Sequence, residues 1–207
     1  MRAILAVPLV LLALAVSACS GGGATASGDS AVGQEVSDRS VTLPDSFGEF
    51  VEYAQACDGL ESDPASKCRA VAERQHGVDV AAAGNLSQAF GGASAEGRTY
   101  VTGDRSGIVT VFVVAGDSPA LWTSEDSDEW VEWTQFHGER LVSQGNADCL
   151  VIVAGGVVRA DVEPAADEWV PVECRASNGE VTALVYPIQG VTVEGALEVT
   201  SQALASA

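Results

Sequence analysis

Apolar residues gather in short segments along the chain, and the strongest of these predict paired β-strands. Three pairs have this pattern: residues 98–102 with 108–114, 140–143 with 149–154, and 170–174 with 181–186. Each pair flanks a stretch rich in turn-forming residues. The second member of each pair is almost entirely apolar, which predicts a strand covered on both faces. The pattern therefore predicts hairpins in an antiparallel sheet.

Four other segments have the apolar spacing of helices. These are residues 45–54, 66–75, 80–90 and 195–205. Asp45 and Ser46 can cap the first, Gly77 predicts the end of the second, and Gly91 the end of the third. Helices against an antiparallel hairpin sheet predict a two-layer α+β domain.

A weak internal repeat gives an alternative fold. Residues 111–133 align on residues 150–172 at an offset of 39, and both copies contain Val-Ala-Gly and Asp-Glu-Trp-Val. This period is close to that of propeller blades. Because two copies cannot close a ring, a propeller-like β repeat is the second choice after the α+β domain.

The first residues have the pattern of an export signal. Residues 3–15 form an apolar run after a basic start, shorter than the ~20 residues that span a bilayer. The following Val16–Cys19 segment (Val-Ser-Ala-Cys) resembles the lipobox of bacterial lipoproteins. The resemblance implies that residues 1–18 are removed and that Cys19 is acylated, so membrane lipid is one expected partner. Such an anchor holds a protein on the extracytoplasmic face of the cell membrane.

The mature chain then divides into a tether and a domain. Residues 19–42 are small and polar with no apolar period, which predicts a flexible linker. Residues 43–207 predict a single extracytoplasmic domain. The net charge of −19, from 29 acidic and 10 basic residues, excludes nucleic acid as a partner, because few cations could neutralise phosphates.

Four further cysteines indicate disulfides in an exported chain. Cys57, Cys68, Cys149 and Cys174 allow three pairings. We favour the local pairing of Cys57 with Cys68 and of Cys149 with Cys174, because Cys149 opens one apolar strand and Cys174 closes another. No Cys-x-x-Cys motif is present, so we expect no metal site.

The sequence contains no catalytic motif that we can identify, and we predict no catalytic residue and no cofactor. The two histidines, His76 and His137, are far apart in the sequence. Acidic residues surround several tryptophans, and two places suggest a glycan or ligand surface. These are Glu129 with Trp130, and Glu168 with Trp169. A calcium-dependent adhesin is a weaker alternative, because the acidic stretch lacks the spacing of a calcium loop.

Several motifs resemble those of exported actinobacterial proteins of unassigned function. They are Asn-Leu-Ser-Gln-Ala-Phe-Gly-Gly-Ala at 85–93, Arg-Thr-Tyr at 98–100, Ser-Pro-Ala-Leu-Trp at 118–122, Asp-Cys-Leu-Val at 148–151 and Glu-Cys-Arg at 173–175. The resemblance covers residue 79 to the C-terminus. It implies a compact α+β domain with a Cys149–Cys174 bond and no catalytic residue.

We therefore expect a lipid-anchored, non-catalytic binding or interaction module of the cell envelope. Its expected partner is an envelope protein or glycan. The alternative is a hydrolase that acts on envelope glycans with two carboxylates beside Trp130 or Trp169.

Overall fold

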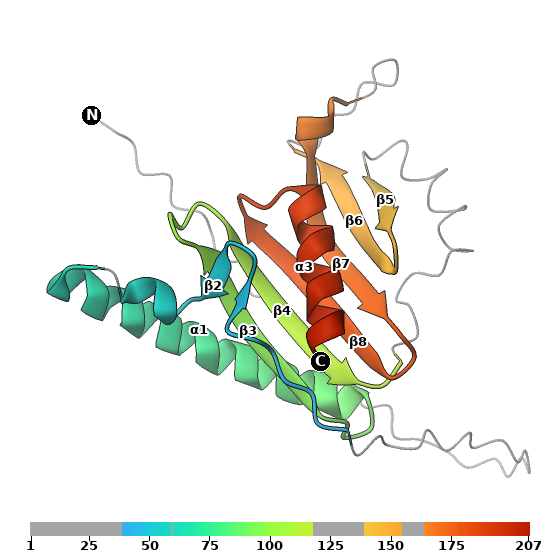
Figure 1. The fold of residues 1–207 in the computed structure, drawn as a ribbon, viewed down its shortest axis with the longest axis horizontal. Helices are drawn as coiled ribbons and strands as arrows, with labels where there is room; N and C mark the ends of the chain where they lie inside the picture. Colours follow the sequence, from blue (N-terminus) through green and yellow to red (C-terminus); the bar gives the residue numbers. More distant parts are fainter. Residues whose placement is uncertain (1–38, 59, 118–138, 155–163) are drawn as a thin grey trace, which may run out of the picture. The chain divides into compact units, whose positions relative to one another are not determined.

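The computed structural model describes residues 39–58, 60–117, 139–154 and 164–207. Within them, one open antiparallel sheet has the strand order β1-β2-β3-β4-β8-β7-β6-β5 (Figure 1). The strands are β1 (Ser46–Phe47), β2 (Phe50–Glu52), β3 (Ala95–Thr102), β4 (Ile108–Ala115), β5 (Glu139–Gln144), β6 (Ala147–Val153), β7 (Trp169–Ser177) and β8 (Val181–Gln189). The helices are η1 (Gln55–Cys57), α1 (Ser62–Ala89), η2 (Ala166–Glu168) and α3 (Val193–Ser206). The predicted α+β fold is confirmed, and the open sheet does not support a propeller.

The three predicted hairpins are present as β3–β4, β5–β6 and β7–β8. The apolar strand β4 lies at the centre, where Val109, Val111 and Val113 are fully buried. Local turn chemistry sets the hairpin register. In the β7–β8 turn, Asn178 Oδ1 accepts the backbone N–H groups of Glu180 and Val181.

The two long helices pack on opposite faces of the sheet. α1 lies against β3 and β4, whereas α3 lies mainly against β6, β7 and β8 (Figure 1). Val111 belongs to the same buried cluster as Leu197 of α3, whereas Phe112 clusters with Ala83 of α1. Successive residues of a strand point to opposite faces, so the two helices are separated by the sheet.

The helix predicted over residues 45–54 is wrong, because this segment forms the β1–β2 hairpin. Phe47 and Phe50 are direct register partners in it, and both are buried. Gly48 has a φ of 56°, which a tight turn requires and which favours glycine. An apolar spacing of three fits a two-residue hairpin as well as a helical turn, and packing of both rings in the core decides the outcome.

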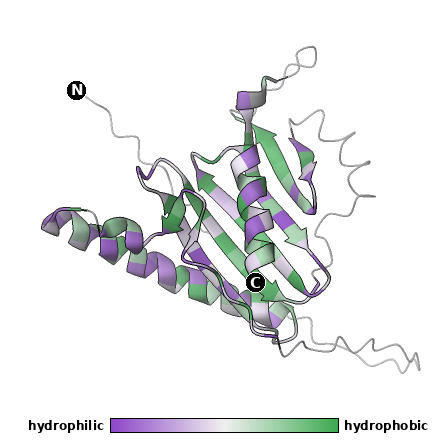
Figure 2. Ribbon diagram, in the orientation of Figure 1, coloured by the Kyte–Doolittle hydropathy of each residue, from purple (hydrophilic) through white to green (hydrophobic). Residues whose placement is uncertain are grey.

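The two helices predicted over residues 66–75 and 80–90 are one continuous helix, so the predicted stop at Gly77 is wrong. Gly77 is exposed, and a helix interior tolerates glycine at a cost of about 1 kcal/mol. The buried stripe of α1 consists of Ala65, Cys68, Ala72, Asp79 and Ala83. Figure 2 shows hydrophilic residues recurring along the helix. Small side chains therefore hold α1 close to the sheet, in place of a leucine-rich face.

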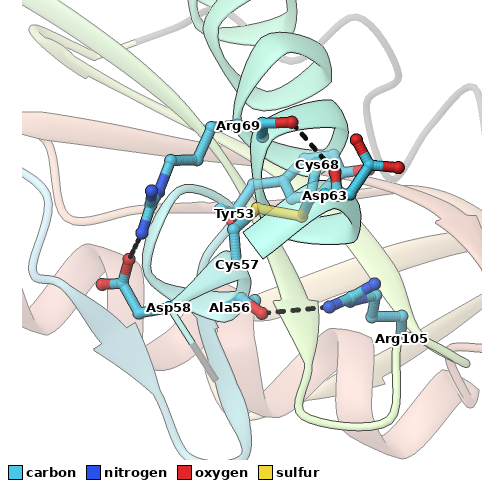
Figure 3. The surroundings of a disulfide bond; sticks show 9 residues. Tyr53, Ala56, Cys57, Asp58, Asp63, Cys68, Arg69 and Arg105 are labelled. Carbon is cyan, nitrogen blue, oxygen red and sulfur yellow. Dashed lines mark hydrogen bonds and ion pairs between the residues drawn. A yellow bond between two sulfur atoms is a disulfide. The ribbon is translucent and has the colours of Figure 1, made fainter. Parts of the chain in front are cut away.

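Both disulfides follow the predicted local pairing. Cys149 and Cys174 are register partners on β6 and β7, with Cα atoms 4.0 Å apart. Cys57 and Cys68 tie η1 to α1 (Figure 3), with Cα atoms 5.7 Å apart. Among the described residues, no helix is both long and apolar enough to cross a membrane.

The β3–β4 turn contains an acid that we expect to make stability depend on pH. Asp104 Oδ1 accepts hydrogen bonds from the Ser106 backbone N–H and from the Thr102 and Ser106 hydroxyls. Together, led by the Ser106 backbone bond, they lower the pKa of Asp104 to about 2. A lowered carboxyl pKa contributes stability above the pKa of the unfolded chain, and this contribution is lost as pH falls towards 2.

An Asp104→Ala variant should therefore melt at a lower temperature than the wild type at pH 7. The difference should narrow as pH falls from about 4 to about 2. Thermal unfolding followed by circular dichroism across this range measures it. A difference that stays constant with pH would show that the charge of Asp104 does not stabilise the turn.

Candidate functional site

A groove lies between α1 and β3. It consists of two neighbouring hollows of about 340 and 360 Å³, and His76 lines both. On the side of the sheet, the first hollow is lined by Arg98 and Thr99, and the second by residues 95–97. We call these two hollows together the β3 edge groove. It follows five consecutive residues of one strand.

The groove exists because β2 is too short to cover β3. β2 pairs only with residues 100–102 of β3, and Tyr53 then donates its backbone N–H to the Thr99 carbonyl at 3.1 Å. Glu52, Tyr53 and Ala54 line the end of the first hollow. The Cys57–Cys68 disulfide follows directly and fixes this end against α1, where Arg69 also binds Asp58 at 2.9 Å (Figure 3).

A close contact between α1 and β3 forms the floor of the groove. A Cβ on Gly97 would overlap the Phe112 ring and would lie 3.0 Å from the Asp79 carbonyl oxygen. Only glycine therefore allows the helix backbone to approach the strand this closely. As a result Asp79 is brought against the sheet and is 2% exposed.

Arg98 forms the charged wall of the groove. Its Nε lies 2.7 Å from Glu96, and its guanidinium also contacts Glu52 at 3.3 Å and Asp45 at 3.4 Å. Burial is the largest single effect and lowers the pKa of Arg98, but the hydrogen bond to Glu96 and the charges of Glu96 and of other neighbours, Glu52 among them, together outweigh it, so the pKa is raised. Arg98 thus stays charged and links β3 to β2 and to the segment before β1.

The Tyr100 side chain lies in the core and does not line the groove. It is fully buried, donates its hydroxyl to the Pro44 carbonyl at 2.7 Å and packs edge-on against Phe47. Burial raises the pKa of Tyr100, so it is neutral at physiological pH. The Arg-Thr-Tyr motif at 98–100 is therefore divided between the groove and the core.

Polar side chains in and near the groove form hydrogen bonds within the protein. Asp79 accepts a hydrogen bond from Gln75 Nε2 at 2.9 Å, and the buried Thr99 and Thr110 hydroxyls share one at 2.9 Å. Among the described residues, no hydrogen bond joins His76 to an acid or a hydroxyl. The same residues contain no cluster of three or more His, Cys, Asp or Glu side chains that could hold a metal ion.

The predicted glycan surface at Glu168 and Trp169 lies elsewhere, at the start of β7. Trp169 is 9% exposed, and the Arg140 guanidinium covers its ring at 4.1 Å. Glu168 accepts the Ala165 backbone N–H at 2.7 Å. The ring face and the carboxylate are both engaged within the protein, which gives stacking of a sugar on Trp169 no support. Glu129, Trp130 and Cys19 lie outside the described residues.

The groove and its buried acid, Asp79, were not predicted from the sequence. A helical stripe of Ala72, Gln75, Asp79 and Ala83 was available as a signal, because these residues recur every three or four positions. An acid in a helix is normally exposed, however, and the sequence does not show which strand end lacks a neighbour.

Comparisons with known proteins leave function to be argued from this geometry. No protein-family model, no curated protein and no solved structure matches the chain. The resemblance to exported actinobacterial proteins therefore remains a prediction.

Proposed function

We propose that the chain is a lipid-anchored lipoprotein on the extracytoplasmic face of the cell membrane, and that its domain is a non-catalytic binding module of the cell envelope. The β3 edge groove carries the binding role, because it combines a fixed shape with polar groups. The lipobox-like segment before Cys19 supports the anchor. Two disulfides support an oxidising compartment.

The anchor is tested by metabolic labelling with an alkyne fatty acid in a lipoprotein-processing bacterium. The wild type should be labelled and should fractionate with membranes, because acyl chains hold it there. Cys19→Ala should abolish the label and release the protein from the membrane fraction. Wild-type protein without label would contradict lipidation, whatever the domain binds.

The binding role is tested against the glycan-hydrolase alternative with purified wall glycan. A hydrolase would release reducing ends, and a Glu168→Gln or Glu129→Gln variant would lose that activity. A binding module should release no reducing ends, either as the wild type or as one of these variants. Turnover that depends on one of these acids would overturn the non-catalytic role and leave the anchor unaffected.

A further inference from the structure

Within the described part of the chain, the edge of β3 inside the groove has backbone groups without partners. In an antiparallel strand, alternate residues direct their N–H and C=O groups to opposite edges. The Ser94 carbonyl accepts the Ala115 N–H on the β4 side, whereas the Thr99 carbonyl accepts the Tyr53 N–H on the β2 side. Ala95 and Gly97 share the direction of Thr99, so their backbone groups point into the groove.

No described residue bonds to these groups. β2 ends its pairing at Tyr100, and the segment before β1 contacts side chains of β3 instead. Val41 donates its N–H to Ser94 Oγ and Leu43 donates its N–H to Glu96 Oε2. Buried backbone groups nearly always have a partner, and Gly97 is buried. The hollow that Gly97 lines is where such a partner fits.

Along the open edge of β3, the two hollows leave a slot beside residues 95–99. α1 covers the face of β3 that carries Gly97 and Thr99, and the segment before β1 runs along the other face (Figure 1). An extended chain entering this slot would continue the line of β2. Addition of a strand to an open sheet edge is an established mode of peptide recognition.

The charge of the groove selects the side chains of that strand. Arg98 is neutralised by Glu96 and Glu52, and Arg69 by Asp58. Glu73 and Asp79 also line the groove, and neither forms an ion pair with any described residue. Lysine or arginine on the incoming strand would complement these carboxylates.

We propose that the β3 edge groove binds an extended, basic segment of a partner protein, which adds as a strand to β3. This inference names the partner class of the proposed binding module and rests on that role, but it does not depend on the anchor. The backbone of Ala95 and Gly97 would supply the ladder hydrogen bonds, and Glu73 and Asp79 would favour basic side chains.

The test uses the oxidised full chain carrying Cys19→Ala and the capped hexapeptide Lys-Val-Lys-Val-Lys-Val. Two analogues are N-methylated, one on every lysine nitrogen and the other on every valine nitrogen. Because a strand pairs through one edge, methylation on that edge should abolish binding and methylation on the opposite edge should leave it. The peptide should also slow hydrogen exchange at the Ala95 and Gly97 amides by about tenfold.

Two protein variants test separately how backbone hydrogen bonds and charge contribute to peptide binding. Ala95→Pro removes one outward N–H from an edge position that does not donate to β4, and it should weaken peptide binding by about tenfold. Glu73→Arg should weaken binding of the basic peptide, whereas the matched control Glu194→Arg on α3 should leave this binding unchanged. A Glu-Val hexapeptide should bind more weakly than the Lys-Val peptide.

Equal binding of both methylated analogues, or binding that leaves the two amides unchanged, would overturn strand addition. Absence of binding by every peptide would overturn the proposed occupant. A glycan that binds and protects the same amides would also overturn it while supporting the broader binding role. Loss of folding in Ala95→Pro would leave the two methylated analogues as the deciding measurement.

Discussion

Replacing Cys149 and Cys174 together by alanine should lower the free energy of unfolding by roughly 3–4 kcal/mol. The disulfide closes a loop across a sequence separation of 25 residues, and its loss frees the unfolded chain. Both cysteines are fully buried between β6 and β7, so truncation also leaves unfilled space under α3. Urea unfolding of both forms at one pH measures the loss.

The matched control removes the other disulfide. Cys57→Ala with Cys68→Ala opens a loop of sequence separation 11 in a small cluster apart from the main core. Its loss should be smaller, about 3 kcal/mol or less. If this variant were the less stable of the two, the β6–β7 disulfide would not be the stronger constraint on the fold.

Gly97→Ala should destabilise the protein by about 3 kcal/mol, although it adds one methyl group. The new Cβ would overlap the buried Phe112 ring on one side and the α1 backbone at Asp79 on the other. Neither the core ring nor the helix backbone can move without losing packing, and overpacking of this kind typically costs 1–3 kcal/mol. Thermal and urea unfolding give the difference.

Two further variants test the cause of that loss. Gly77→Ala, on the exposed side of α1 with no atom within 4 Å of its new Cβ, should stabilise the protein by up to about 1 kcal/mol. Adding Phe112→Leu to the Gly97→Ala variant should recover part of the lost stability, because the smaller side chain no longer overlaps the new Cβ. Additive effects of Gly97→Ala and Phe112→Leu would contradict the contact.

The strands could be predicted from the sequence because their apolar residues pack directly in the hydrophobic core. β4 and β8 have long buried apolar runs, and the turns between hairpin partners contain glycine, aspartate and asparagine. The Cys149–Cys174 pairing followed from the two apolar strands that Cys149 opens and Cys174 closes. Hairpin pairing is local in sequence, so composition and turn chemistry suffice to predict it.

The helical part could not be predicted as well, because its packing depends on the partner surface. α1 buries alanine and aspartate against Gly97, and such a stripe has little apolar contrast. Val78 and Val80 of the same helix are more than half exposed, which weakens the pattern further. The groove depends on where β2 stops pairing with β3, which is a tertiary property.

The strand order has a consequence for how the domain folds. Among the described strands, β1–β4 and β5–β8 are each arranged in sequence order, and the β4–β8 pairing joins strands that lie farther apart in the chain than β2 and β3 do. Closing that long loop costs entropy before its contacts form, so this pairing is expected to limit the folding rate. α3 follows β8 and packs on it. A chain that emerges N-terminus first can therefore pair β1–β4 early. It completes its core only once α3 has also emerged and can pack on the sheet.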